Sequence, residues 1–403
     1  MRIVGLVTEF NPLHLGHVHY IKESKSISNA SHVVAVMSPN FVQRGEPAII
    51  DKWSRAKLAI NAGVDLVLEL PTIYATQSAE RFSNCSIAIL NKIPNLHGIV
   101  FGSENGDINL LKKISTILNN TKIEKEIFSL VKDGFSYPQA RDQILKKHLT
   151  LKEINDLSLS NNILAISYLK YIQNHSPNLK TYTIKRIGAN YNDLNIKKLS
   201  SASAIRKELL SNTNFDLKTS LPPNTLKALI SFKNNHQVFG NIDAYYNLIQ
   251  YKFLDRQSNF AEKIIDYEPG LENRIYNAFK NSANFNDAIN QIHCKRYTKT
   301  RIQRFLIHSA LNITKKMYQN SENGNINYIR VLAANKRGLE ILSHTKKNSN
   351  VNIVTQFNKS IKYLPEKEKK FLLNENYYSN IYYKFINSNN FIDSELTTNP
   401  FNH

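Results

Sequence analysis

The chain has 403 residues, 42% of them hydrophobic, and carries 52 Lys and Arg against 32 Asp and Glu, a formal net charge of +20. This length predicts two domains, or three, rather than one, and no apolar run approaches a membrane span, so we expect no membrane partner. The opening residues MRIVGLVTEF are too short and too interrupted for a signal peptide, and Cys85 and Cys294 form no CxxC pair. We therefore expect a cytoplasmic protein with no disulfide framework and no structural zinc.

The charge is the strongest bulk feature of the chain. A large positive excess favours polyanions, and nucleic acid in particular, as partners. An Asn- and Lys-rich chain can also reflect coding bias alone, so the charge does not decide the function.

The first two hundred residues alternate between apolar, β-rich runs and helical stretches. Nearly continuous hydrophobicity predicts strands of a parallel sheet buried on both faces, at residues 2–7, 32–38, 64–70, 97–103 and 180–187. Strand–helix–strand repetition of this kind predicts a doubly wound, Rossmann-like α/β domain. Residues 107–170 are predicted to form a helical insertion in it.

Beyond residue 215 the strand signals fade. The stretches TLKALISFKNN, TRIQRFLIHSALNIT and YIRVLAANKRGLEILSH indicate a mainly helical, basic domain, and the two prolines of LPPN at 221–224 mark the boundary. The predicted division is thus 1–215 and 216–403. The tail after 374 shows no clear periodicity.

The stretch TEFNPLHLGH, residues 8–17, follows the first predicted strand. Ligands of parallel sheets bind at the carboxyl ends of strands, and a helix N-terminus favours phosphate. A helix starting near Leu13 would put His14 and His17 on one face, where two imidazoles could donate to a charged oxygen, while Gly16 would let a ligand approach the backbone. A metal site using His14, His17 and His19, or incidental histidines, are the alternatives. No GxxxxGK[ST] pattern occurs, which excludes a Walker-type site.

A second stretch, LSSASAIRKELL at 199–210, follows the fifth predicted strand and opens a helix. Ser200, Ser201 and Ser203 supply hydroxyl donors, and Arg206 lies one turn in. Alone it could be an ordinary N-cap, but together with HLGH it indicates a specific anion site.

HLGH and SSASAIR resemble the HxGH and ISSTxIR motifs of the nucleotidylyltransferase superfamily. The resemblance is closer to one family: GLVTEFNPLHLGHVHYI, VAVMSPNFVQRGEPAIIDKWSRAKLAINAGVDLVLELP, FGSENGD, SNNILAISYLK, KRIGANYND and RYTKTRIQRFLIH are similar to the bacterial tRNA(Met) cytidine acetate ligases, over roughly residues 1–340. Ser203 stands where the family has Thr, and Ala165 and Ala333 stand where Gly is expected.

The resemblance implies an ATP-dependent ligase, with ATP and acetate as substrates, that makes acetyl-adenylate and acetylates the wobble cytidine of elongator tRNA(Met) to N4-acetylcytidine. It implies a catalytic role for His14, His17 and Arg206 in stabilising charge at the α-phosphorus. ATP is expected to contact Val7, Thr8, Glu9, Phe10, Asn11, Pro12, Leu13, His14, Leu15, Gly16, His17, Val18, His19, Tyr20, Gly102, Asn161 or Asn162 (with Asn162 favoured), Arg186, Ile187, Ser201 and Ser203.

Several further residues have two interpretations. Arg44 in QRGEP could position acetate or pyrophosphate, or simply be solvated. Glu104 and Asp107 could hold Mg²⁺ through water, which makes this ion a candidate cofactor, or could act as N-caps. No protein-bound metal is predicted, and no protein partner is implied.

The segment HCKRYTKTRIQR, residues 293–304, contains basic side chains interleaved with Tyr297 and no acid. This pattern suits an RNA backbone with a stacked base, so tRNA contacts are predicted at Lys295, Arg296, Lys299, Arg301 and Arg304. NYIRVLAANKRG adds Arg330, Lys336 and Arg337 as candidates, although a solvated helix face is the alternative.

Two other functions compete with the ligase. A small-molecule adenylyltransferase would share the HxGH chemistry but leave the basic helical domain unexplained. A noncatalytic RNA-binding protein would not need an intact HLGH and Arg206.

Overall fold

The computed structural model describes residues 1–402 apart from 158, 187–200, 212–216, 256–258 and 321–324. The main sheet has the strand order β10-β8-β5-β2-β1-β6-β7, with β9 paired to β8. All five predicted strands are confirmed and pair in parallel: β1 (Ile3–Thr8), β2 (His32–Met37), β5 (Leu66–Glu69), β6 (Leu96–Ser103) and β7 (Lys180–Lys185). Every residue of β2 and β5 is buried, as continuous apolar runs predict.

The same sheet takes three more strands from the C-terminal part of the chain. The segment YIRVLAA, predicted to be helical, forms β8 (Tyr328–Ala334), which runs antiparallel to β5 and is buried at all seven positions. That prediction was wrong because a short apolar run has no decisive period, and here β-branched and aromatic residues fit a buried strand. The sheet is completed by β9 (Asn352–Val354) and β10 (Phe401–Asn402). The division at residue 215 stays a prediction.

Helices connect the parallel strands. They are α1 (Leu15–Ser28), α2 (Lys52–Asn61), α3 (Thr72–Ala75) and α4 (Ala79–Leu90), and a small hairpin of β3 (Phe41–Val42) and β4 (Glu46–Pro47) follows β2. The helical insertion is confirmed between β6 and β7, where α9 packs on α4 and β6: α5 (Ile108–Leu118), α6 (Thr121–Lys132), α7 (Tyr137–Leu145), α8 (Leu151–Leu157) and α9 (Ser160–His175).

The rest of the chain is mainly helical, as predicted. Its helices are α10 (Ala202–Ser211), α11 (Pro223–His236), α12 (Tyr246–Leu254), α13 (Phe260–Lys263), α14 (Leu271–Asn281), α15 (Phe285–Ile292), α16 (Lys299–Leu311), α17 (Lys315–Gln319), α18 (Lys336–Asn348), α19 (Phe357–Ser360) and α20 (Glu366–Phe385). Short 3-10 turns lie at Leu217–Thr219, Ile242–Tyr245, Asn389–Phe391 and Ser394–Leu396. The tail that showed no periodicity thus includes most of the 20-residue α20. None of the helices within the described ranges is long and apolar enough to cross a membrane.

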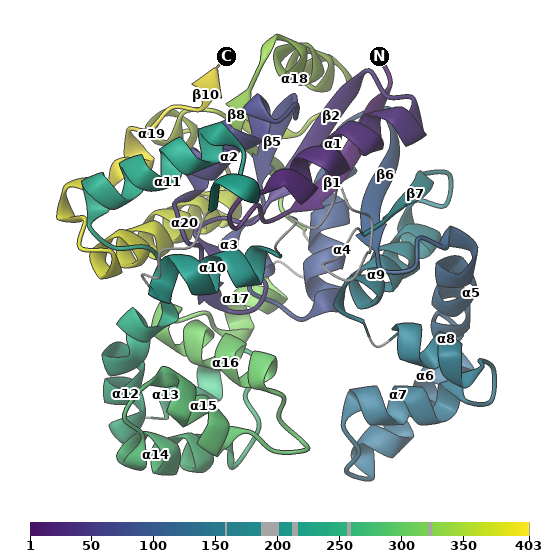
Figure 1. Cartoon of the computed structure of the whole chain (residues 1–403), viewed down its shortest axis with the longest axis vertical. Coiled ribbons are helices and arrows are strands. Elements are labelled where there is room, and N and C mark those ends of the chain that lie inside the picture. Colours follow the sequence, from purple (N-terminus) through teal and green to yellow (C-terminus); the bar gives the residue numbers. More distant parts are fainter. Residues whose placement is uncertain (158, 187–200, 212–216, 256–258, 321–324, 403) are drawn as a thin grey trace.

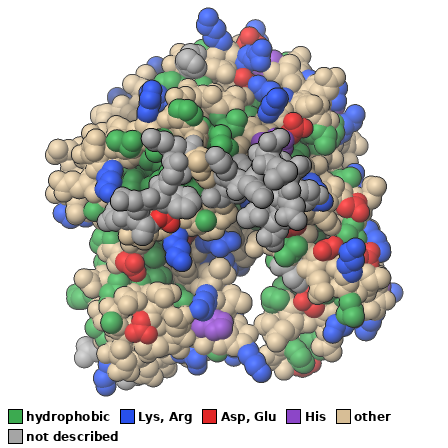
Figure 2. Space-filling model, viewed as in Figure 1, with side chains coloured by type: hydrophobic (Ala, Val, Ile, Leu, Met, Phe, Trp, Pro, Cys, Tyr) green, Lys and Arg blue, Asp and Glu red, His purple; other side chains and the backbone are tan. Residues whose placement is uncertain are grey.

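Two helical lobes extend below the sheet in Figure 1. One is formed by the insertion helices α5 to α8, and the other by α12 to α16. The space-filling view is open between these lobes (Figure 2). The carboxyl ends of the parallel strands point toward them, so ligands bound at this edge would lie near both lobes.

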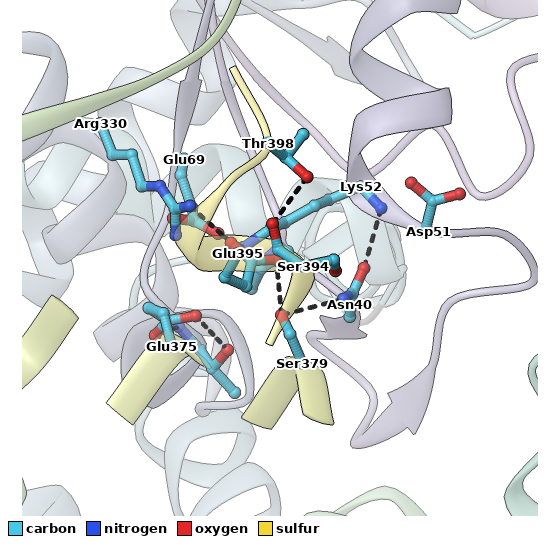
Figure 3. A network of polar contacts seen from close by, with 12 residues as sticks. Asn40, Asp51, Lys52, Glu69, Arg330, Glu375, Ser379, Ser394, Glu395 and Thr398 are labelled. Carbon is cyan, nitrogen blue, oxygen red and sulfur yellow. Dashed lines mark hydrogen bonds and ion pairs between the residues drawn. The ribbon is translucent and has the colours of Figure 1, made fainter. Parts of the chain in front are cut away.

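A buried ionic network joins the C-terminal segment to the sheet. Lys52 at the start of α2 pairs with Glu69 and, at 3.0 Å, with Glu395, while Arg330 in β8 pairs with Glu69 at 3.1 Å and with Glu395. Figure 3 shows these four side chains converging from distant parts of the sequence, and none is more than 3% exposed. Arg330 is therefore not available to RNA, and that candidate contact is wrong.

Candidate active site

The site is built around the loop between β1 and α1. The Arg55 guanidinium donates to the carbonyl oxygens of Glu9 (2.7 Å) and Ser38 (3.0 Å), and so ties together the ends of β1 and β2. Asn11 Oδ1 accepts from the backbone N–H of Ile49 at 2.8 Å. Arg55 and Asn11 are almost fully buried, so these contacts hold the loop in a fixed position.

His14 and His17 form a stacked pair at the start of α1. The helix begins at Leu15 rather than near Leu13, with His14 at its N-cap. The two rings lie 3.8 Å apart between centroids at 24°, which confirms the prediction that they share a face. The backbone N–H of His14 donates to Nδ1 of His17 at 3.2 Å, so a neutral His17 carries its proton on Nε2.

Both imidazoles are neutral at pH 7. Burial and then the charge of Arg186 lower the pKa of His14 to about 4. Burial, His14 and Arg186 hold the pKa of His17 well below its usual range. A neutral imidazole still donates one hydrogen bond, and its N–H can stabilise charge that develops on a phosphate oxygen.

Gly16 packs directly against the imidazole of His14. A Cβ at this position would lie 2.8 Å from Cε1 of His14. Any side chain here would therefore displace the imidazole, so Gly16 preserves the histidine pair as well as an open backbone.

Two atoms in this loop are left for a ligand. Nδ1 of His14 and Nδ2 of Asn11 are buried and have no hydrogen-bond partner among the described residues. Buried polar groups are usually paired, so these two atoms are available to hydrogen-bond a bound molecule. Glu9, whose pKa burial raises, accepts the N–H of Gln43 at 2.8 Å and is already engaged.

Arg186 and Gly102 meet where β7 and β6 end. The backbone N–H of Arg186 donates to the Ser103 carbonyl at 2.8 Å, and a Cβ on Gly102 would lie 3.3 Å from Cγ of Arg186. The exposed guanidinium acts electrostatically on both histidines, so the structure brings this predicted phosphate ligand to the same site. Ile187 lies outside the described residues.

Arg206 reaches the loop from α10. Its Nη1 donates to the carbonyl of Asn11 at 2.9 Å, and its Nη2 pairs with Glu46 Oε1 at 2.7 Å. The two motifs, some 190 residues apart in sequence, are thus in direct contact. Ser201 accepts the N–H of Ala204 at 3.3 Å, as an N-cap does, and its hydroxyl lies 3.0 Å from that of Ser203.

Comparison with known proteins decides the family. A family described as HIGH Nucleotidyl Transferase matches residues 1–396. The tRNA(Met) cytidine acetate ligase of Clostridium perfringens strain SM101 is 40% identical, over 89% of this chain and 91% of that protein, and the one of Clostridium novyi is 38% identical over 99% of both. The crystal structure of Thermotoga maritima TmcAL bound with alpha-thio ATP superposes with a TM-score of 0.90 at 29% identity, covering 100% of this chain and 99% of that one.

This chain belongs to the tRNA(Met) cytidine acetate ligase family of HIGH nucleotidyl transferases. The family resemblance, the membership of the HxGH superfamily and the α/β class with its helix-rich C-terminal part are confirmed. The individual ligand contacts stay predictions.

Asn161 and Asn162, two of the residues predicted to contact ATP in this ligase family, lie in the first turn of α9. Asn162 is 1% exposed, and its amide donates to the Asp156 carbonyl at 2.7 Å and accepts from the Glu104 N–H at 3.0 Å. Asn161 is only half-buried and donates to Glu104 at 2.7 Å. Asn161 is therefore the more accessible of the two, and the preference for Asn162 as the ATP contact stays a prediction.

The two acids of FGSENGD are engaged as helix caps. Glu104 accepts the N–H groups of Asn161 and Asn162, and Asp107 accepts those that open α5. Throughout the described ranges no three His, Cys, Asp or Glu residues cluster as a metal site. Mg²⁺ stays a candidate that would arrive with the nucleotide.

The ligase family's expected Gly positions, Ala165 and Ala333, lie in the core. Both are fully buried, Ala165 in α9 and Ala333 in β8, where it pairs with Val67.

The predicted tRNA-binding residues fall into two groups. Lys295, Arg296 and Lys299 are exposed. Arg301 and Arg296 both pair with Glu268 and flank the ring of Tyr297. Arg304 is largely enclosed, with its Nε buried, and its backbone packs against Gly45 of the hairpin.

Sequence reasoning missed Glu46 and Arg55, because their partners are distant in sequence and no local pattern marks them.

Proposed function

We propose that this chain activates acetate with ATP to form acetyl-adenylate and transfers the acetyl group to the wobble cytidine of elongator tRNA(Met), in the cytoplasm. The observation that carries the proposal is the neutral His14–His17 pair in contact, through Asn11, with Arg206. The names of the family's curated relatives, which cover nearly the same length, support the same reaction.

In the first half-reaction a carboxylate oxygen of acetate bonds to the α-phosphorus. The bond from that phosphorus to the bridging oxygen breaks, and pyrophosphate leaves. In this proposal Nε2–H of His17 and the remaining donors of Arg206 stabilise the oxygens that gain negative charge as this happens. Arg186 adds positive charge at the same edge of the sheet. No nucleophile on the protein is required, because acetate itself attacks.

In the second half-reaction the exocyclic amine of cytidine attacks the acetyl carbon. The bond to the AMP oxygen breaks, and the amine loses one proton. This amine is a weak nucleophile, so binding must position it. An unpaired anticodon base can be presented in this way, and the exposed Lys295, Arg296 and Lys299 would contact the tRNA backbone. In this proposal residues 1–215 form the adenylate and residues 216–403 bind tRNA.

The test uses purified protein, labelled acetate, ATP and total bacterial tRNA, with nucleosides analysed by mass. Acetylcytidine that requires both ATP and acetate supports the ligase. Pyrophosphate release with another acceptor and no acetylated tRNA would instead indicate a small-molecule adenylyltransferase, and no ATP turnover at all would indicate an RNA-binding protein.

His17→Ala provides a matched variant. It should keep its fold and its affinity for tRNA but lose acetate-dependent ATP–pyrophosphate exchange, because the variant lacks the imidazole donor. Normal exchange in His17→Ala would contradict the assigned site.

A further inference from the structure

The β3–β4 hairpin, residues 41–47, lies between the histidine loop and helix α16. On the loop side, the backbone N–H of Gln43 donates to Glu9 Oε1 at 2.8 Å, and its side chain donates to the Gln77 carbonyl at 2.9 Å. On the other side, a Cβ added to Gly45 would lie 2.7 Å from Cα and 2.8 Å from N of Arg304. The hairpin is therefore fixed from both directions.

Helix α16 is itself anchored to the sheet domain. Nε2 of His308 lies 2.6 Å from the carbonyl of Thr76, and His308 is fully buried. Because Thr76 directly precedes Gln77, the helix and the hairpin share the same short stretch of chain as a support.

Glu46, the first residue of β4 in this hairpin, meets Arg206. Their ion pair is 2.7 Å long, and both side chains are at most 20% exposed. A guanidinium has five N–H donors in a fixed plane, and the contacts to Glu46 and to the Asn11 carbonyl use two of them. Two bonds to one plane fix its orientation, and the other three donors make no hydrogen bond to the described residues.

We propose that Glu46 is the positioning residue for Arg206, and that the packing of Gly45 against α16 holds Glu46 in place. Glu46 touches no reacting atom. It sets the plane of the guanidinium before ATP binds, so that the remaining donors meet the α-phosphate as charge develops. The inference rests on the proposed function, since it assigns Arg206 to adenylate formation.

The first test measures acetate-dependent ATP–pyrophosphate exchange in wild type, Glu46→Gln, Arg206→Ala and the double variant. Glu46→Gln keeps the size of the side chain but loses the charge. We expect its kcat to fall about 10- to 100-fold, as for a misplaced catalytic group, with KM for ATP within about threefold of wild type. The double variant should be no slower than Arg206→Ala alone, because Glu46 acts through Arg206.

Two results would overturn the positioning role. One is a wild-type rate in Glu46→Gln, and the other is a double variant whose loss equals the product of the two single losses. Glu80→Gln is the control, since this carboxylate pairs with Lys170 at 2.8 Å on the surface and should leave exchange unchanged. Absence of exchange in the wild type itself would refute the proposed function rather than the role of Glu46 within it.

The second test moves the hairpin without touching its charges. Gly45→Ala and Gly134→Ala both place a side chain at positive φ, +75° and +96°, but only Gly45 has atoms nearby; Gly134 has none within 4 Å. Backbone strain is thus matched, and the contact with α16 differs. Exchange should fall in Gly45→Ala and not in Gly134→Ala, at a temperature where circular dichroism shows both to be folded. Equal rates in the two would show that the packing of Gly45 against α16 does not affect adenylate formation.

Discussion

Replacing Glu395 with Gln should destabilise the protein by removing one charge from a balanced, buried network. Burial opposes ionisation of Glu395, but Lys52 and Arg330 lower its pKa to about 2. Burial and then the charge of Glu69 raise the pKa of Glu375 to about 8, so Glu375 is mostly neutral at pH 7. The network therefore holds two cations and two carboxylates, and Glu395→Gln leaves one positive charge uncompensated.

The magnitude follows from burial. The four charged side chains are at most 3% exposed, so water cannot replace the lost carboxylate. Removing one partner of such a pair costs about 3–5 kcal/mol, whereas removing opposite charges together can be close to neutral. We therefore expect Glu395→Gln to cost about 3–5 kcal/mol, and Lys52→Met with Glu395→Gln to cost less than Glu395→Gln alone.

Urea unfolding followed by tryptophan fluorescence suits this test. Trp53 is the single tryptophan, and Lys52 Nζ and the Arg330 guanidinium lie 5.6 and 5.3 Å from its ring centre. Glu366→Gln is the control, because this exposed carboxylate lies 4.0 Å from Lys369 and should contribute less than about 1 kcal/mol. A loss under about 1 kcal/mol in Glu395→Gln, or a double variant with the summed losses, would refute the charge-balance reasoning.

Two further predictions concern pH and RNA. Burial lowers the pKa values of His14 and His308 to about 4, whereas the unfolded value is about 6.5. Between pH 4 and pH 6.5 the unfolded chain therefore binds more protons than the folded chain, and the free energy of unfolding should fall as pH drops through that window. From pH 7 to pH 5 each histidine should lower the free energy of unfolding, measured in urea, by about 2 kcal/mol. His308→Asn should weaken this pH dependence; an unchanged pH dependence would contradict the burial of a neutral imidazole. Lys299→Ala should weaken tRNA binding and make its salt dependence less steep by about one unit, while Lys370→Ala, at an exposed lysine on α20, should not; equal effects would show that the RNA surface is not at α16.

The strands of the sheet could be predicted where burial on both faces leaves a continuous apolar run. All five runs in the first two hundred residues form parallel strands, with ends within two residues of the prediction. Strand β8 was missed because β5, its antiparallel neighbour in the sheet, lies far away in sequence and no period separates a short buried strand from a helix. Arg330, in that strand, was taken for an RNA contact, since nothing local indicates that Glu395 neutralises it.

The site was predictable to the extent that its chemistry is local. HLGH and SSASAIR each mark a helix start, and the resemblance implies that both serve one site, where Arg206 contacts the carbonyl of Asn11 in the structure. The choice between Asn161 and Asn162 depended on which side of α9 faces the core, and two adjacent residues at a helix start give no sequence signal for that. Glu46 could not be found, because its role exists only once α10 is brought against the hairpin.

Helix α16 shows how one basic segment can serve two purposes. Helical geometry turns residues five apart to different sides, so Lys299 faces solvent while Arg304 packs its backbone against Gly45. Both residues are predicted RNA contacts, but Lys299, at the N-terminal end of α16, is exposed whereas Arg304 is only partly exposed. The other end supports the hairpin that holds Glu46, and through it Arg206. The surface predicted to bind tRNA and the support of the adenylation site therefore lie on the same rigid element, about one and a half turns apart. A tRNA bound at that end of α16 would thus be held at a fixed distance from the adenylate, which is the positioning that a weak amine nucleophile requires.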